Sequence, residues 1–366
     1  MNYKEIEIHC LICKRDLLLA INNFKSLCKF EEFAQMPIFF HDDGSLSSTD
    51  KTMLMESIQN VTFIDRAWAD QQIARFIDKH PFSKTYRLVD KHIHLWHKIK
   101  LYDYYFFSKT KKILGMDTDL LFLRKPQNIL NYINNNIPFY FPDVNDAYCF
   151  QEPKDEIPVP SRTNTGLIYI PSPEYYNLDD IEHALSNLLK NGVNYFPAWI
   201  EQSAFAHMFY KNGKYLPLSA NLYRIPYFQQ VNVDEVECLH FVSYPAVRET
   251  YDRYMDYLKF ENGTKLYDKK FVVKFDTKNI DLSVKIYKTE SFLNFNYGWF
   301  LEKAGQNALD HAFRIEAENG FISESKFQSE KSGFFFVPSK LKNLKIYHTT
   351  DWYGKMDWKL IDTVSL

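Results

Sequence analysis

Along the N-terminal part of the chain, the spacing of apolar residues switches repeatedly between two periods. An alternating or continuous apolar run predicts a strand, and apolar residues at every third or fourth position predict a helix. The expected strands are residues 5–13, 36–41 and 61–64, and the expected helices are residues 16–30 and 49–58. Strands that alternate with helices in this way favour a parallel α/β sheet.

The alternation continues to about residue 258 and then gives way to strands with few helices. Before that point we expect helices over residues 90–107, 178–189 and 199–209, and strands over residues 112–116, 120–123, 139–141, 167–170 and 238–242. After it we expect strands over residues 271–275, 281–287, 334–337 and 344–347, with a turn at Asn319 and Gly320. Because no low-complexity linker separates the two parts, we predict an α/β domain of residues 1–258 packed with a smaller β-rich domain of residues 259–366.

The composition limits the possible classes of protein. A length of 366 residues suits about two domains, and 46% hydrophobic with 25% charged residues is typical of a folded chain. The formal net charge of -2 gives no general attraction to nucleic acid or to an anionic membrane. The N-terminus lacks a signal-peptide pattern, and no apolar stretch approaches the ~20 residues that cross a bilayer. We expect a cytoplasmic protein with no membrane span and no nucleic-acid partner.

The five cysteines are odd in number and scattered, so we expect reduced thiols rather than a disulfide framework. Cys10 and Cys13 have C-x-x-C spacing, but both lie in an expected strand, and no second pair completes a zinc site. This pair is therefore interpreted as buried small side chains.

The sharpest chemical signal is the pair Asp117 and Asp119, which follows the apolar strand 112–116. In open α/β sheets ligands collect beyond the carboxyl ends of strands, where these carboxylates are expected to lie. Two carboxylates that point to one place suit a hard divalent cation such as Mg²⁺ or Mn²⁺. The alternative is an acidic turn that only caps a helix; the preceding strand favours the metal site.

Several basic residues are further candidates, each with an ordinary structural alternative. Lys98 and Lys100 precede the D-x-D strand and could meet phosphate oxygens, although lysines on amphipathic helices are often only solvated. His240 ends the expected strand 238–242 and could be a third metal ligand or a hydrogen-bonded core histidine. A zinc site is a weaker alternative, and its candidate ligands are His92, His94 and His97.

Taken in order, these elements resemble the GT-A nucleotide-sugar glycosyltransferases, in particular the glycogenin-like family 8 group of retaining enzymes, over residues 1 to about 255. The matching motifs are Lys98 in WHKIKLYD, the Asp117-Thr118-Asp119 triplet, Asn164-Thr165-Gly166, the pair Glu201-Gln202 and His240 in LHF. Two departures stand out. Glutamate replaces the family's aspartate at position 201, and the H-x-x-G-x-x-K-P-W pattern is absent, with Arg248 in roughly the corresponding place.

The resemblance implies a role for each matching residue. Asp117, Asp119 and His240 would bind Mn²⁺ or Mg²⁺ on the donor diphosphate, and Asp143, Glu201 and Gln202 would orient the sugar, with Gln202 near the anomeric carbon. The implied donor-binding residues are Cys13, Lys14, Asp42, Asp43, Lys98, Asp117, Thr118, Asp119, Asn164, Gly166 and Arg248. Asp146 is an alternative to Asp143, and Asp42 and Asp43 are equally consistent with an ordinary Asp-Gly turn.

The expected function is therefore transfer of a sugar from a nucleotide-sugar donor, with UDP-sugar favoured and GDP-sugar possible, to a carbohydrate or other hydroxyl acceptor. Retention is expected from the resemblance; if the enzyme inverts, Glu201 is the first candidate for the base. Two other classes stay open. A nucleotidyltransferase could use paired aspartates, although no glycine-rich basic loop follows the first strand. A non-catalytic glycan-binding protein could use the 31 Phe and 25 Tyr residues, most of which we interpret as core.

Overall fold

The computed structural model describes residues 2–89, 97–149, 157–190, 197–226, 235–242, 251, 254, 264–275, 278–288, 292–301, 311–318, 322–324, 332–338, 343–350 and 359–365. The chain forms two compact units. The first comprises Met1–Ile225 and Glu235–Tyr244, and the second comprises Pro226–Asp234 and Pro245–Leu366. The predicted boundary after residue 258 thus falls inside the second unit.

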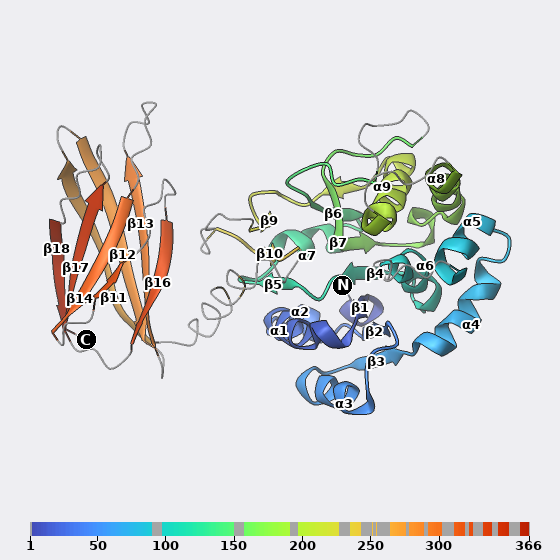
Figure 1. Cartoon of the computed structure of the whole chain (residues 1–366), viewed down its shortest axis with the longest axis horizontal. Coiled ribbons are helices and arrows are strands. Elements are labelled where there is room, and N and C mark those ends of the chain that lie inside the picture. Colours follow the sequence, from blue (N-terminus) through green and yellow to red (C-terminus); the bar gives the residue numbers. More distant parts are fainter. Residues whose placement is uncertain are drawn as a thin grey trace. The chain divides into compact units, whose positions relative to one another are not determined.

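The first unit is built on a seven-stranded sheet with the order β3-β2-β1-β4-β7-β6-β8 (Figure 1). Its strands are β1 (Glu7–Ile12), β2 (Ile38–Asp42), β3 (Val61–Ile64), β4 (Ile113–Met116), β6 (Phe139–Pro142), β7 (Thr163–Ile170) and β8 (Leu216–Pro217). The pairs from β3 to β4 are parallel, whereas β7 runs antiparallel to both β4 and β6. The prediction of a mostly parallel α/β sheet is confirmed.

Helices connect and cover these strands. They are α1 (Leu17–Cys28), α2 (Glu31–Ala34), α3 (Ser48–Ser57), α4 (Arg66–Phe76), α5 (Pro81–Lys84), α6 (Lys98–Phe107), α7 (Gln127–Asn134), α8 (Leu178–Lys190) and α9 (Ile200–Asn212), with a π-helical turn over Thr85–Val89. Helix α3 begins with a capping box in which Ser47 and Asp50 satisfy each other's backbone N–H groups. Of the helix expected over residues 90–107, residues 90–96 lie outside the described part of the chain.

One hydrophobic core joins α6, α8 and α9 to the sheet, and Figure 1 shows these helices grouped together. The sheet contributes Ile113 of β4 and Ile168 and Ile170 of β7, all essentially inaccessible to solvent. Helix α6 packs against β1 and β4, α9 packs against β7, and the two helices pack against each other. Because β4 and β7 are paired, the first turns of both helices are fixed relative to the end of β4.

A second, smaller sheet was not predicted. It pairs β10 (Cys238–His240) antiparallel with β5 (Leu120–Phe122) and parallel with β9 (Tyr223–Arg224). The strand expected over residues 120–123 is therefore not a continuation of β4. The chain turns at residues 117–119 and enters another sheet, which places a turn between two buried strands.

The second unit contains two four-stranded antiparallel sheets (Figure 1), so the expected β-rich C-terminal part is confirmed. One sheet has the order β11 (Thr264–Phe275), β12 (Lys278–Lys288), β13 (Phe292–Leu301) and β16 (Ser332–Pro338). The other has the order β15 (Ile322–Glu324), β14 (His311–Ala317), β17 (Asn343–Thr350) and β18 (Lys359–Ser365). The predicted turn at Asn319 and Gly320 lies outside the described residues.

In the described part of the chain, none of the helices combines the length and the apolar character that a bilayer crossing requires.

Candidate metal and donor site

Three turns meet at one edge of the main sheet. Strands β1, β2 and β4 are parallel neighbours, so the residues that follow them lie at the same edge. The backbone N–H of Lys14, after β1, donates to Oγ of Ser45 at 2.8 Å and joins two of these turns. The D-x-D turn follows β4, next to β1.

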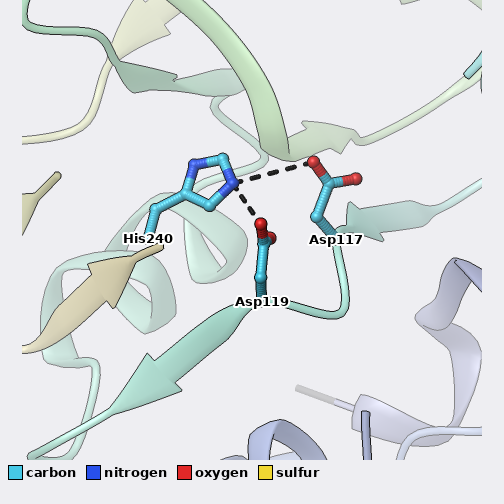
Figure 2. Close-up of side chains that lie close together, drawn as sticks. All are labelled: Asp117, Asp119 and His240. Atoms are coloured by element: carbon cyan, nitrogen blue, oxygen red, sulfur yellow. Dashed lines mark ion pairs between the residues drawn. The ribbon is translucent and has the colours of Figure 1, made fainter. Parts of the chain in front are cut away.

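Asp117, Asp119 and His240 converge beside this edge (Figure 2). One potential ligand atom from each residue lies within 4.8 Å of the other two. Opposite ligands of an octahedral ion with ~2.1 Å bonds are about 4.2 Å apart, so only a small adjustment would bring all three onto one ion. Asp119 Oδ1 is buried and its neighbour is a ring nitrogen of His240, an atom that can also bind a metal, so the pair fits two ligands of one cation.

His240 reaches the two aspartates because of strand pairing. It lies opposite Leu120 in the antiparallel pair of β10 and β5, and the N–H of Phe241 donates to the carbonyl of Asp119 at 2.9 Å. Its Nε2 atom is 3.1 Å from Asp119 Oδ1 and 3.7 Å from Asp117 Oδ2 (Figure 2). The histidine is thus fixed by the same small sheet that begins directly after Asp119.

The charges of this group depend on one another. Burial opposes protonation of His240, but the carboxylates of Asp119 and Asp117 outweigh it and raise the pKa of the imidazole above its ordinary value. Burial acts against the charged form of Asp117, yet Lys100 and His240 lower the pKa of that carboxyl. The two carboxylates therefore favour the protonated imidazole, and a metal ion, which binds the neutral ring, would compete with that proton.

The lysine beside the D-x-D turn is Lys100. Its Nζ atom donates to Asp117 Oδ1 at 2.8 Å and lies 3.6 Å from Glu201 Oε1. Lys98, which the family resemblance indicated, is also buried at the start of α6. The helix brings the second of the two candidate lysines to the aspartate, because residues two apart on a helix face different directions.

Glu201 is a buried carboxyl at the start of α9, only 3% exposed. Thr165 donates its hydroxyl to Oε2 at 3.1 Å, while Oε1 accepts no hydrogen bond from the described residues. Burial raises the pKa of Glu201 to about 7 against the opposing effect of Lys100. The side chain can therefore exist in either protonation state near neutral pH.

The Asn164-Thr165-Gly166 segment connects the other candidates. Nδ2 of Asn164 donates to Asp143 Oδ2 at 3.0 Å, and Oδ1 of Asn164 accepts from the N–H of Gly166 at 2.8 Å. Asp146 accepts instead from the backbone of Arg162 at 2.6 Å. Of the two alternatives, Asp143 is the carboxylate that lies next to this segment.

The remaining predicted residues have their own contacts. Gln202 donates from Nε2 to the carbonyl of Ala147 at 2.6 Å, and Thr118 is buried in the D-x-D turn. Asp42 accepts from the N–H of Gly44 at 2.8 Å and pairs with Lys51 at 3.0 Å.

Asp43 accepts from the N–H of Ser45 at 2.9 Å, so both aspartates support an Asp-Gly turn. The Cys13 thiol donates to Asp16 at 3.2 Å, the Lys14 side chain is largely exposed, and Arg248 lies outside the described residues.

No protein-family model and no curated protein matches the sequence. Among solved structures, the chain is similar to the galactosyltransferase LgtC in complex with donor and acceptor sugar analogues, at 13% identity and a TM-score of 0.46, over 69% of this chain and 95% of that chain. It is also similar to core-mannan synthase A (CmsA/Ktr4) from Aspergillus fumigatus in its Mn/GDP form, at 9% identity and a TM-score of 0.37, over 58% of this chain and 72% of that chain. A third similar structure is TarS of S. aureus, at 10% identity and a TM-score of 0.32, over 97% and 77% of the two chains.

Proposed function

We propose that this chain is a divalent-metal-dependent glycosyltransferase that moves a sugar from a nucleoside-diphosphate sugar to a hydroxyl of a carbohydrate or related acceptor. The observation that carries the proposal is that His240, from a distant part of the sequence, meets Asp117 and Asp119 at the carboxyl edge of the sheet. A purely structural acidic turn has no need of a buried histidine between its carboxylates.

The three residues are the proposed ligands of Mn²⁺ or Mg²⁺, for which carboxylate oxygens are suitable donors. When bound, such a cation supplies charge stabilisation to the departing nucleoside diphosphate. The predicted Lys98 stays a donor-binding candidate, and Lys100, beside Asp117, is added as a second positive charge on that side of the site. Arg248 stays a candidate from the sequence resemblance.

The donor sugar is proposed to lie between the metal site and α9. Asp143 and Asn164 present a joined carboxylate and amide, which suits recognition of sugar hydroxyls. Glu201 and Gln202 open α9 and contribute a carboxyl and an amide from the helix side. Both are fixed by helix packing, so their positions do not depend on a mobile loop.

In the proposed retaining reaction, the bond between the anomeric carbon and the phosphate oxygen breaks, and a bond from the acceptor oxygen to that carbon forms. The acceptor proton passes to the leaving phosphate, so no separate base is needed. If the enzyme inverts, Glu201 is the candidate base, since a pKa of about 7 matches general base catalysis near neutral pH. UDP-sugars are the favoured donors and GDP-sugars the second candidates, and a cytoplasmic location is proposed with them.

A panel of nucleotide-sugars incubated with purified protein and Mn²⁺ tests the proposal. A glycosyltransferase releases nucleoside diphosphate, a nucleotidyltransferase forms pyrophosphate, and a glycan-binding protein forms neither. The matched variants are Asp119→Asn, which keeps the size of the side chain, and Asp78→Ala, which removes an exposed aspartate paired with Lys84. Release from one donor that is lost in the first variant and kept in the second supports the proposal; release that persists in both contradicts it.

A further inference from the structure

A buried asparagine on α1 contacts the backbone of the D-x-D turn. Asn23 is fully inaccessible to solvent, and its Nδ2 atom donates to the backbone carbonyl of Asp117 at 2.8 Å. The contact joins residues 94 positions apart in the sequence. No motif in the sequence indicates it, because Asn23 lies within an ordinary apolar helix pattern.

The asparagine is unfavourable for the helix that carries it. It lies on the buried face of α1 among Ala20, Phe24 and Leu27, all of them fully buried. Its Oδ1 atom is buried and accepts no hydrogen bond from the described residues. A buried amide with an unpartnered oxygen destabilises a fold relative to an apolar side chain of similar size, so the packing of α1 does not explain this residue.

The contact does explain the geometry of Asp117. The N–H of Asp117 donates to the carbonyl of Gly166 at 2.8 Å, and its carbonyl accepts from Asn23. Both backbone groups of the residue are therefore fixed, one by β7 and one by α1. With the backbone held on two sides, the carboxylate direction is set before any cation arrives.

Ser26, one turn further along α1, makes a comparable contact that does not involve the D-x-D turn. Its Oγ atom accepts from the N–H of Phe122 at 3.0 Å, within strand β5. The Ser26 hydroxyl also donates to the backbone carbonyl of Asn23 at 2.7 Å, but not to its side chain. The two side chains thus hold different parts of the same segment, and Ser26 serves as a control for Asn23.

We propose that Asn23 is a positioning residue for the metal site, where it orients the carboxylate of Asp117 through the backbone of that residue. The inference rests on the proposed function, because it takes Asp117 as a metal ligand. Partners that orient metal ligands typically change metal affinity by about 10-fold to 100-fold when removed. Loss of Asn23 is expected to weaken binding of Mn²⁺ by at least about tenfold while leaving the fold intact.

In the test, Mn²⁺ is titrated into the full chain and its binding is monitored by electron paramagnetic resonance. One series contains UDP and a second series contains GDP. The variants are Asn23→Leu, of similar size, Asn23→Ala, in case the leucine does not fit, and Ser26→Ala. Thermal unfolding is measured for each. We expect both Asn23 variants to bind Mn²⁺ about tenfold more weakly, with a melting temperature close to that of the unchanged protein for Asn23→Leu and a lower one for Asn23→Ala, which leaves a cavity. Ser26→Ala is expected to lose stability but keep its Mn²⁺ affinity.

Two results separate failure of this inference from failure of the proposed function. If the unchanged protein binds Mn²⁺ and both Asn23 variants bind it equally well, Asn23 does not position the site and the inference is wrong. The same holds if affinity falls only in proportion to stability across all three variants. If the unchanged protein binds no Mn²⁺ with either nucleotide, the proposed metal site itself is contradicted.

Discussion

The imidazole of His240 lies directly against the α-carbon of Gly166. A Cβ atom added at position 166 would be 2.1 Å from Cε1 of His240 and 2.7 Å from each ring nitrogen, far inside contact distance. Because these atoms belong to a buried ring whose own strand is paired with β5, the ring has little freedom to move aside. The glycine is required here by the close approach of the histidine.

We therefore predict that Gly166→Ala displaces His240 from the two aspartates. Insertion of a methyl group into such a site costs about 1–3 kcal/mol of unfolding free energy. Mn²⁺ affinity, measured by calorimetry in the presence of UDP or GDP, is expected to fall at least tenfold. The matched control is Gly213→Ala, which strains the left-handed residue after α9 and lowers stability without touching the triad. Equal Mn²⁺ affinity in both variants would contradict the assignment of His240.

Removal of the Lys100 charge is predicted to raise the pKa of Glu201 further above 7, since burial then acts without an opposing cation. Lys100→Met leaves buried Glu201 and half-buried Asp117 uncompensated, and about 3 kcal/mol of stability should be lost at pH 8. Lys112→Met is the control, because that lysine pairs with Glu5 at the surface, where such pairs contribute ~1 kcal/mol or less. Denaturant unfolding at pH 8 measures the stability of both variants. Equal losses of unfolding free energy would argue against a stabilising role for the buried contacts of Lys100.

Glu201 should also affect the dependence of stability on pH. The folded protein retains a proton on this carboxyl up to about pH 7, whereas the unfolded chain releases it near 4.5. Between these values the folded state binds more protons, so the contribution of Glu201 to stability decreases as the pH rises through this range. The difference in unfolding free energy between the unchanged protein and Glu201→Gln, measured from pH 5 to pH 8, is expected to fall accordingly. A flat difference would mean that the carboxyl titrates normally.

The buried histidine pair on β1 and β2 should change the stability with pH in the opposite direction to Glu201. Nδ1 of His9 lies 2.9 Å from Nε2 of His41, both rings are buried, and burial lowers the pKa of each. The folded state therefore resists protonation of these rings, whereas the unfolded chain takes up protons below about 6.5, so stability is lost as the pH falls below that value.

The loss is at most about 1.4 kcal/mol per pH unit for each histidine, and it ends at the pKa of that histidine in the folded state. His41→Phe is expected to reduce the slope of unfolding free energy against pH between 5 and 6.5, whereas His183→Gln, at an exposed position, should leave it unchanged. An unaltered slope in His41→Phe would show that the pair does not resist protonation.

The sequence predicted the main sheet well because each of its strands is a local pattern. Strands β1, β2, β3 and β4 each appear as short apolar runs, and Asp117 and Asp119 follow such a run. What the patterns could not supply is the pairing between distant segments. The antiparallel contact of β10 with β5, which brings His240 to Asp119, joins segments more than a hundred residues apart.

The choice between Lys98 and Lys100 shows that local patterns also fail to predict which side of a helix faces the site. Both lysines precede the D-x-D strand, and the motif comparison selected the first. Only the rotation of α6 about its axis, fixed by packing against α9, determines which side chain reaches Asp117. Asn23 had no sequence signal at all, since its role depends on a backbone carbonyl, which every residue type carries.

Anomalous X-ray diffraction from crystals grown with Mn²⁺ and UDP or GDP tests directly whether Asp117, Asp119 and His240 bind one divalent cation. We expect an anomalous peak about 2.0–2.3 Å from an oxygen of each aspartate and from Nε2 of His240. The peak should be absent in crystals of Asp119→Asn grown under the same conditions. A peak that lies elsewhere, or no peak while the three side chains keep the positions in Figure 2, would contradict the account.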